Sequence, residues 1–126
     1  EFDWIILAVP ATPETEGMIG AAELAAMKPD AVIINIARGS VIDQSALVEA
    51  LQNKALSAAF LDVTTPEPLP PEHPLWSLPN AHITMHLSGR AQTKMFVRSG
   101  DRFLDNLGKY LRGEPIGPIF DPRKGY

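Results

Sequence analysis

The sequence of 126 residues predicts an α/β fold, in which helices flank a parallel sheet. Short apolar runs alternate with segments of helical period, in the order strand, helix, strand, helix, strand, loop, strand, helix. Three charged residues, Arg38, Glu67 and His86, each follow such a run by one to a few positions. Because the carboxyl ends of parallel strands border one crevice, we expect a guanidinium, a carboxylate and an imidazole to meet there.

The first strand is expected at residues 4–9, a nearly continuous apolar run that Pro10 closes. Such a run is typical of a strand that is covered on both faces. Small residues at 21–28 favour a helix, which ends before Pro29 because proline cannot continue a helix.

The second strand is expected at 31–36, where the residues are apolar and β-branched, directly before Arg38. Asp43 has the position of an N-cap for a helix that reaches about Asn53. The third strand, at about 56–63, brings Asp62 to its end.

Six of the twelve prolines lie between residues 66 and 79, which predicts a stiff, irregular loop around Glu67. The fourth strand is expected at 81–85, directly before His86. A long helix is expected from about 90 to 112, with Gly113 as its stop and with a stripe of large apolar residues that belongs to a core or an interface. The tail that follows has no clear period.

Composition limits the classes of function. The formal net charge of −4 argues against a general nucleic-acid or anionic-membrane surface. The absence of cysteine excludes disulfides and cysteine-ligated metal sites, which fits a cytoplasmic protein, and no metal site is predicted. No apolar run reaches the ~20 residues of a membrane span, so we expect a soluble chain. Because the chain opens on Glu1 and enters a strand almost at once, we expect it to be part of a longer protein.

A parallel sheet of this order supplies roughly half of a doubly wound domain, but no GxGxxG turn, the usual seat of a dinucleotide pyrophosphate, is present. From spacing alone, the chain has a crevice with polar groups and no phosphate cradle.

Several motifs follow one another along the chain: Val9-Pro10-Ala11-Thr12-Pro13-Glu14-Thr15, Met27-Lys28-Pro29, Ile34-Asn35-Ile36-Ala37-Arg38-Gly39-Ser40-Val41-Ile42-Asp43, Leu61-Asp62-Val63, Glu67-Pro68-Leu69-Pro70 and His73-Pro74-Leu75-Trp76. In this order they resemble the D-isomer-specific 2-hydroxyacid dehydrogenases. Spaced motifs in one order are more specific than a single short pattern. The final residues, 121–126, are similar to the ends of glyoxylate/hydroxypyruvate reductases in this family.

The resemblance implies that residues 1–89 form the second half of a Rossmann-like dinucleotide-binding domain, whose GxGxxG half lies upstream of this chain. Residues 90–126 are then a helix and tail that return toward an absent substrate domain. The family transfers a hydride between NAD or NADP and a small 2-oxoacid or D-2-hydroxyacid, and it usually forms homodimers.

The resemblance also assigns catalytic roles. Arg38 matches the arginine that binds the substrate carboxylate and polarises the ketone, a task that suits a guanidinium fork. His86 matches the general acid, and Glu67 matches its partner carboxylate, whose negative charge favours the protonated ring and fixes its orientation. Removal of Glu67 should therefore lower the pH at which reduction falls off.

By the same matching, a set of residues is expected to contact the cofactor, with Asp62 holding the carboxamide and the backbone at 88 and 89 closing on the nicotinamide. The set is Val9, Pro10, Thr15, Ile36, Ala37, Arg38, Asp62, His86, Ser88 and Gly89. The chain departs from the family at Met85, where proline is usual, and at Thr64 and Thr65, where an aromatic and an acidic residue are common.

Other interpretations of single residues stay open at this stage. An isolated arginine after a strand is usually a surface ion-pair partner, an isolated glutamate in a proline loop is usually solvated, and Asp62 could equally cap a turn. His73 and His82 match no motif and are interpreted as structural. Besides an enzyme, the sequence allows a dinucleotide-responsive interaction protein of the corepressor kind, or a catalytically inactive fragment.

Overall fold

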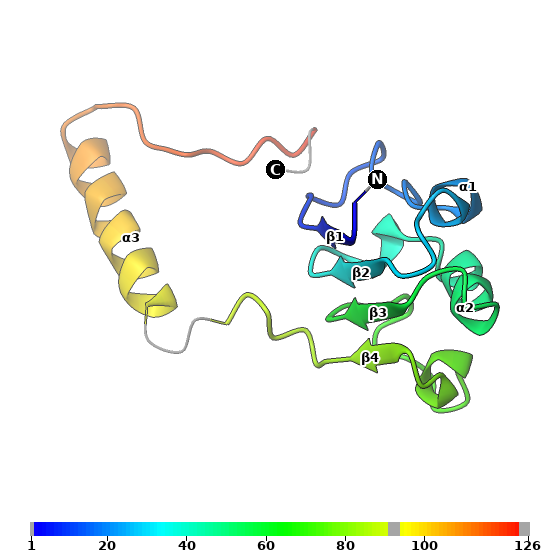
Figure 1. The fold of residues 1–126 in the computed structure, drawn as a ribbon. Coiled ribbons are helices and arrows are strands. Elements are labelled where there is room, and N and C mark those ends of the chain that lie inside the picture. The colour runs from blue at the N-terminus through cyan, green and yellow to red at the C-terminus, as the bar shows by residue number, and fades with distance from the viewer. Residues whose placement is uncertain (1, 91–93, 124–126) are drawn as a thin grey trace. The chain divides into compact units, whose positions relative to one another are not determined.

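The computed structural model of the chain describes residues 2–90 and 94–123, which divide into two compact units, Glu1–Ser88 and Gly89–Tyr126. The first unit holds a four-stranded sheet with two α-helices, and the second holds one long helix and the tail (Figure 1). The predicted α/β fold is confirmed.

The sheet contains β1 (Trp4–Leu7), β2 (Val32–Asn35), β3 (Ala58–Leu61) and β4 (Ala81–Ile83), in the order β1-β2-β3-β4. Every neighbouring pair is parallel, so the carboxyl ends of all four strands lie at one edge. All four strands were predicted, and each is shorter than expected because the apolar runs continue past the last paired residue.

The core lies on one face of this sheet, where α1 (Ala21–Ala25) and α2 (Gln44–Gln52) pack (Figure 1). Its central side chains are at most 1% exposed: Leu24, Ile33, Leu47, Leu51, Leu56 and Leu75. Burial of one such side chain contributes about 1.5–3 kcal/mol relative to its exposure to water.

The two helices of the first unit begin and end for identifiable reasons. The Asp43 carboxylate accepts hydrogen bonds from the backbone N–H groups of Ser45, at 3.0 Å, and Ala46, at 3.1 Å, so the predicted N-cap of α2 is confirmed. Helix α1 ends at Ala25, three residues before the predicted end, because a tight turn already forms there ahead of Pro29.

The opposite face of the sheet is open in the first unit. Ile6, Ile34, Phe60 and His82 form a row across it, with Ile6 60% and Phe60 41% exposed. The His82 ring stacks on Phe60, with ring centroids 4.5 Å apart. The prediction that the first strand is covered on both faces is therefore wrong within the described residues of this unit, because both helices pack on the other face.

The second unit is organised around α3 (Met95–Leu111), whose C-cap is Arg112 and which is followed by Gly113 in the left-handed conformation, at φ 69°. This confirms the predicted stop. The predicted start near residue 90 falls partly on 91–93, which lie outside the described residues, as does the end of the tail at 124–126. No residue of α3 is buried, so its apolar stripe is uncovered within the part of the second unit that the structure describes.

None of the helices formed by the described residues has the length and apolar character needed to cross a membrane.

Candidate active site

Two of the three predicted catalytic side chains meet at the carboxyl edge of the sheet. His86 Nδ1 lies 3.0 Å from Glu67 Oε1, and each side chain is slightly more than 40% exposed. Glu67 comes from the loop after β3, and His86 follows β4 by three residues. The edge therefore presents an imidazole with one nitrogen already occupied by a carboxylate.

The backbone at His86 has the left-handed conformation, with φ 54°. This conformation is uncommon for residues other than glycine, and it persists where the surrounding contacts hold it in place. Here the contacts come from the next two residues, whose backbone N–H groups both donate to Asp62.

Asp62 is buried at the end of β3 and joins that strand to the segment around His86. Its Oδ1 accepts a hydrogen bond from the Thr84 hydroxyl and one from Leu87 N, at 3.0 Å, and its Oδ2 accepts one from Ser88 N, at 2.8 Å. Burial alone raises the pKa of Asp62, but the hydrogen bonds from Ser88, Thr84 and Leu87 outweigh it and hold the pKa well below its usual range. The carboxylate is thus ionised and fixed.

Arg38 lies at the same edge, after β2, but contacts neither Glu67 nor His86 among the described residues. Its Nη1 donates to the Ala37 carbonyl oxygen, at 2.7 Å. Asn35 is 1% exposed and shapes this turn: its Oδ1 accepts from Ala37 N at 3.0 Å, and its Nδ2 donates to Arg38 O at 2.9 Å. Arg38 therefore lies at the expected edge of the sheet, but its guanidinium binds its own turn instead of meeting Glu67 and His86.

The turn that carries Arg38 packs directly on the loop that carries Glu67. A Cβ atom added to Gly39 would overlap the backbone carbonyl group of Thr64 and the Thr65 hydroxyl. Only a residue without a side chain fits this approach. The two loops therefore touch even though their charged side chains do not.

The residues predicted to contact the cofactor at the end of β1 differ in what their side chains do. Val9 is half-buried and Pro10 is exposed. The Thr15 hydroxyl donates to Pro10 O, at 2.7 Å, and accepts from Thr12 N, at 2.9 Å. It therefore organises its own turn, in which the Thr12 hydroxyl, 3.4 Å away, is a further hydrogen-bond partner.

The remaining predicted cofactor residues lie after β2, β3 and β4. Ile36 is exposed and Ala37 is buried, while Gly89 begins the second unit. Ile36, Asp62 and Ser88 border one hollow of about 400 Å³ on the open face of the sheet. Phe60 and Leu87 add apolar walls to it. A hollow with apolar walls and one carboxylate fits a nicotinamide ring, whose faces are apolar and whose carboxamide is polar.

A second hollow, of about 410 Å³, lies beside the Glu67 loop. It is bordered by Asp62, Glu67, Leu69, Trp76 and Met85, among others. Met85 is 80% exposed and directly precedes His86, so the departure from proline puts an exposed, flexible apolar side chain in the segment that leads to the imidazole.

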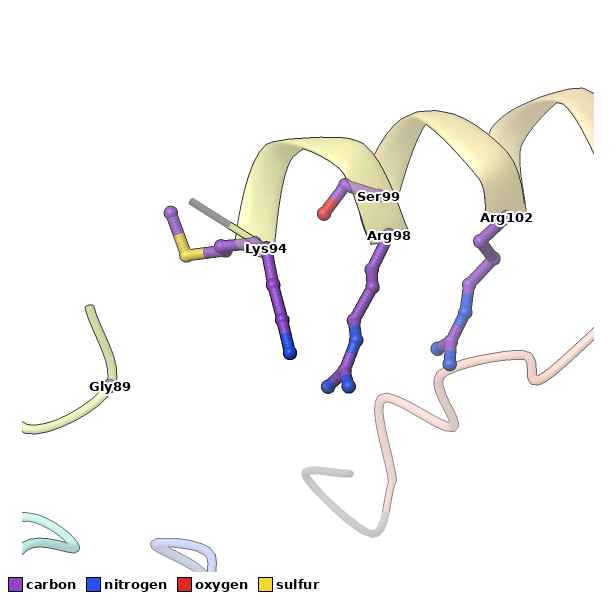
Figure 2. Close-up of a pocket in the computed structure, with 6 residues that line it drawn as sticks. Gly89, Lys94, Arg98, Ser99 and Arg102 are labelled. Atoms are coloured by element: carbon purple, nitrogen blue, oxygen red, sulfur yellow. The ribbon is translucent and has the colours of Figure 1, made fainter. Parts of the chain in front are cut away.

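The second unit has a polar feature of its own. Lys94, Arg98 and Arg102 extend from the same side of the chain at the start of α3, beside Met95 and Ser99 (Figure 2). None of the three cations forms an ion pair with another residue in the described ranges. Like charges at a spacing of four residues cost a helix about 0.2–0.5 kcal/mol per pair.

Sequence reasoning did not find three polar residues that support the site: Asn35, Gln44 and Thr84. Asn35 is polar at the end of an apolar strand, which is a usable signal for a buried hydrogen-bonding role. Gln44 and Thr84 occupy ordinary positions, at the start of a helix and after a strand, and only the folded structure shows their contacts.

A parallel sheet with polar side chains at its carboxyl edge, a histidine–carboxylate pair and an adjacent apolar hollow defines a protein of the nucleotide-binding α/β class. The family profile described as D-isomer specific 2-hydroxyacid dehydrogenase, NAD binding domain, matches residues 1–88. The chain belongs to this family, and the resemblance seen in its motifs is confirmed.

Individual relatives agree with this assignment. The glyoxylate/hydroxypyruvate reductase B of Pectobacterium atrosepticum is 40% identical over 114 residues, which are 90% of this chain and 35% of that protein. The crystal structure of a D-isomer specific 2-hydroxyacid dehydrogenase from Xanthobacter autotrophicus, in complex with NADPH and MES, superposes with a TM-score of 0.87 at 37% identity. The match covers 98% of this chain and 50% of that one.

A second solved structure is the NADPH-dependent glyoxylate/hydroxypyruvate reductase of Sinorhizobium meliloti, in complex with NADP and sulfate. Its TM-score is 0.86 at 29% identity, with 98% of this chain and 40% of that one covered. The chain thus spans about 35–41% of the length of the first curated relatives that it matches. The expected cofactor class, NAD or NADP, is confirmed by the match to the NAD binding domain.

Proposed function

We propose that this chain supplies the catalytic histidine, its carboxylate and the substrate arginine of an NAD(P)-dependent reductase of small 2-oxoacids, of the glyoxylate/hydroxypyruvate type. The observation that supports the proposal most directly is the contact of 3.0 Å between His86 Nδ1 and Glu67 Oε1 at the carboxyl edge of a parallel sheet. The names of the relatives support the substrate class.

Proton donation falls to His86. Because Glu67 occupies Nδ1 as an acceptor, Nδ1 carries a proton and Nε2 is the nitrogen that faces the reaction. The reduced nicotinamide, when bound, supplies the hydride. As the hydride forms a bond to the ketone carbon, the ketone oxygen takes the Nε2 proton and becomes a hydroxyl group, and the ring is left neutral.

Substrate binding falls to Arg38. Its guanidinium has to leave the Ala37 carbonyl oxygen, 2.7 Å away, to receive the substrate carboxylate through two hydrogen bonds. The same charge stabilises the negative charge that develops on the neighbouring ketone oxygen. Arg38 therefore serves both the ground state and the transition state.

Cofactor binding is assigned to the edge residues. Ile36 and Ala37 would contact the nicotinamide ribose, Val9 and Pro10 would line the adenosine and nicotinamide channel, and Ser88 and Gly89 would border the ring. Asp62 receives three hydrogen bonds from the chain, and a carboxylate has about four acceptor positions, so it retains one for the carboxamide N–H.

The decisive experiment measures oxidation of NADH and NADPH by the full-length protein with glyoxylate, hydroxypyruvate or phenylpyruvate. His86→Gln is expected to lower kcat by about 10²–10⁴-fold, the usual contribution of a general acid. Glu67→Gln is expected to lower kcat, because the His86 ring loses the carboxylate that contacts its Nδ1.

A matched control lies in the same proline-rich loop. Glu72 is exposed and makes no side-chain hydrogen bond to the described residues, so Glu72→Gln should leave kcat unchanged. Absence of turnover with all three acids, in a protein that still binds the dinucleotide, would favour the dinucleotide-responsive interaction protein instead. A homodimer and a cytoplasmic location stay predictions.

A further inference from the structure

The loop that carries Glu67 is weakly held by its own backbone. Thr64 and Leu69 are buried at its two ends, while residues 65–68 between them are exposed. No backbone–backbone hydrogen bond among the described residues involves 64–69, and prolines at 66 and 68 remove two backbone donors. Within the loop, the Thr64 hydroxyl donates to Pro66 O at 3.0 Å, and further support for Glu67 has to come from another element.

Gln44, the first residue of α2, makes that connection. Its Nε2 donates to Thr65 O at 2.6 Å, and its Oε1 accepts from Thr65 N at 2.8 Å. The amide thus pairs with both backbone groups of one residue, as a neighbouring strand does. The same Nε2 lies 3.1 Å from His73 Nε2, and His73 Nδ1 accepts from Leu75 N at the start of the short helix 74–77.

The anchor of Gln44 is itself rigid. Asp43 caps α2, and Leu47 on the next turn is 1% exposed in the core. The pairing therefore ties the exposed loop to the buried scaffold two residues before Glu67. Position matters here, because a displacement of about 1 Å in a catalytic group can cost on the order of 100-fold in rate.

We infer that Gln44 is a positioning residue, which holds the Glu67 carboxylate against the His86 imidazole through the two backbone hydrogen bonds to Thr65. The inference rests on the proposed function for its effect on turnover, but the placement of Glu67 can be tested without turnover. Of the charged groups at this edge, Arg38, Asp62 and Glu67, only Glu67 contacts the His86 ring within the described residues.

The test compares Gln44→Ala, Glu67→Gln and the double variant in the full-length protein. Gln44→Ala should lower kcat by about tenfold, with the KM for the 2-oxoacid changed less than twofold. Because both changes act through one contact, the double variant should be no slower than Glu67→Gln alone. Gln52→Ala, an exposed glutamine at the other end of α2, is the matched control and should change nothing.

NMR spectra of the His86 ring nitrogens, recorded at one fixed pH, separate this inference from the proposed function. Gln44→Ala should move the Nδ1 signal toward its position in Glu67→Gln, because both variants weaken the contact with the carboxylate, even if no 2-oxoacid is reduced; in that case the reductase proposal fails and the positioning role stands. An unchanged Nδ1 signal, or a double variant whose loss equals the product of the single losses, would overturn the positioning role. If Gln44→Ala does not fold, Gln44→Met keeps the length of the side chain without its hydrogen bonds and gives the same readout.

Discussion

The sheet unit, Glu1–Ser88, and the helix unit, Gly89–Tyr126, differ in how far their apolar side chains are buried. In the sheet unit, the apolar side chains that face the core, such as Leu24, Ile33 and Leu47, are almost fully buried. Polar side chains at the strand ends, such as Asn35 and Asp62, bind neighbouring backbone groups. In α3, every apolar side chain retains solvent exposure, and Phe96 reaches 77%. The candidate site therefore depends on a packed core that holds its loops in place. Within the described residues, α3 is stabilised instead by the helix propensity of its sequence and by ion pairs on its surface.

The largest expected difference concerns matched leucines. Leu47→Ala removes a side chain that is 1% exposed and should lower the free energy of unfolding by about 2–5 kcal/mol, through lost burial and the cavity left behind. Leu104 is 64% exposed, so Leu104→Ala should change it by less than about 0.5 kcal/mol. Urea unfolding of both variants checks the pair.

Equal losses in the two variants would contradict this contrast. They would mean that the apolar side of α3 is covered in solution by other parts of the protein or by a second molecule. The same measurement at several protein concentrations separates these two cases, because only association between molecules makes the loss depend on concentration.

The second contrast concerns two glycines. Gly39→Ala places a Cβ atom onto the Thr64 carbonyl, so the Arg38 turn or the Glu67 loop has to move, at a cost of about 1–3 kcal/mol. In Gly100→Ala the added atom meets nothing within 4 Å, and an exposed helix should gain about 0.5–1 kcal/mol. Thermal unfolding should therefore move in opposite directions, and only Gly39→Ala should lower turnover. Stabilisation by Gly39→Ala would contradict the close approach of the two loops.

Sequence reasoning found the parts of the site that depend on strand ends. The order of the strands and the Asp43 cap follow from local patterns, and the resemblance placed Glu67 beside His86, which a carboxylate–histidine contact of 3.0 Å agrees with. Local patterns could not show that Gln44 reaches Thr65, 21 positions away, or that Gly39 packs on Thr64. These contacts depend on how α2 is set against the sheet, which no single segment encodes.

The open sheet face was mispredicted for a related reason. A continuous apolar run shows that both sides of a strand are apolar, but it does not show that the same unit covers both sides. Ile6 and Phe60 are apolar and exposed together, because α1 and α2 occupy only the opposite face.

The third prediction contrasts the stability that the Asp62 carboxylate contributes at neutral pH with the stability that it contributes at low pH. The pKa of Asp62 is held below its usual range, so its ionised form is favoured in the folded chain. As the pH falls below about 4, the usual value of an aspartate, the unfolded chain takes up a proton before the folded chain does, and the contribution of Asp62 is progressively lost. Asp62→Asn should therefore lower the free energy of unfolding by about 1–2 kcal/mol at neutral pH, and by less at pH 3.

Chemical unfolding of wild type and Asp62→Asn between pH 3 and 7 provides the test. Other carboxylates titrate alike in both proteins and cancel in the difference. A difference that stays constant across this range would show that the Asp62 carboxylate is not the ionised acceptor of the hydrogen bonds from Leu87 and Ser88.

The smallest expected effect is the loss in the free energy of unfolding when a surface ion pair is removed, and it should be similarly small in the two units. Asp105 pairs with Lys109 on α3 at 2.7 Å, and Asp3 pairs with Lys28 in the sheet unit at 2.6 Å, in both cases with well-exposed aspartates. Asp105→Asn should cost about 0.3–0.5 kcal/mol, as exposed pairs one helical turn apart usually do, and Asp3→Asn should be similarly weak. Both effects should vanish in 1 M salt, where the screening length is about 3 Å. A large loss in the free energy of unfolding that persists in 1 M salt would show that the substituted pair is buried. The two units would then differ in their ion pairs as well as in their apolar side chains.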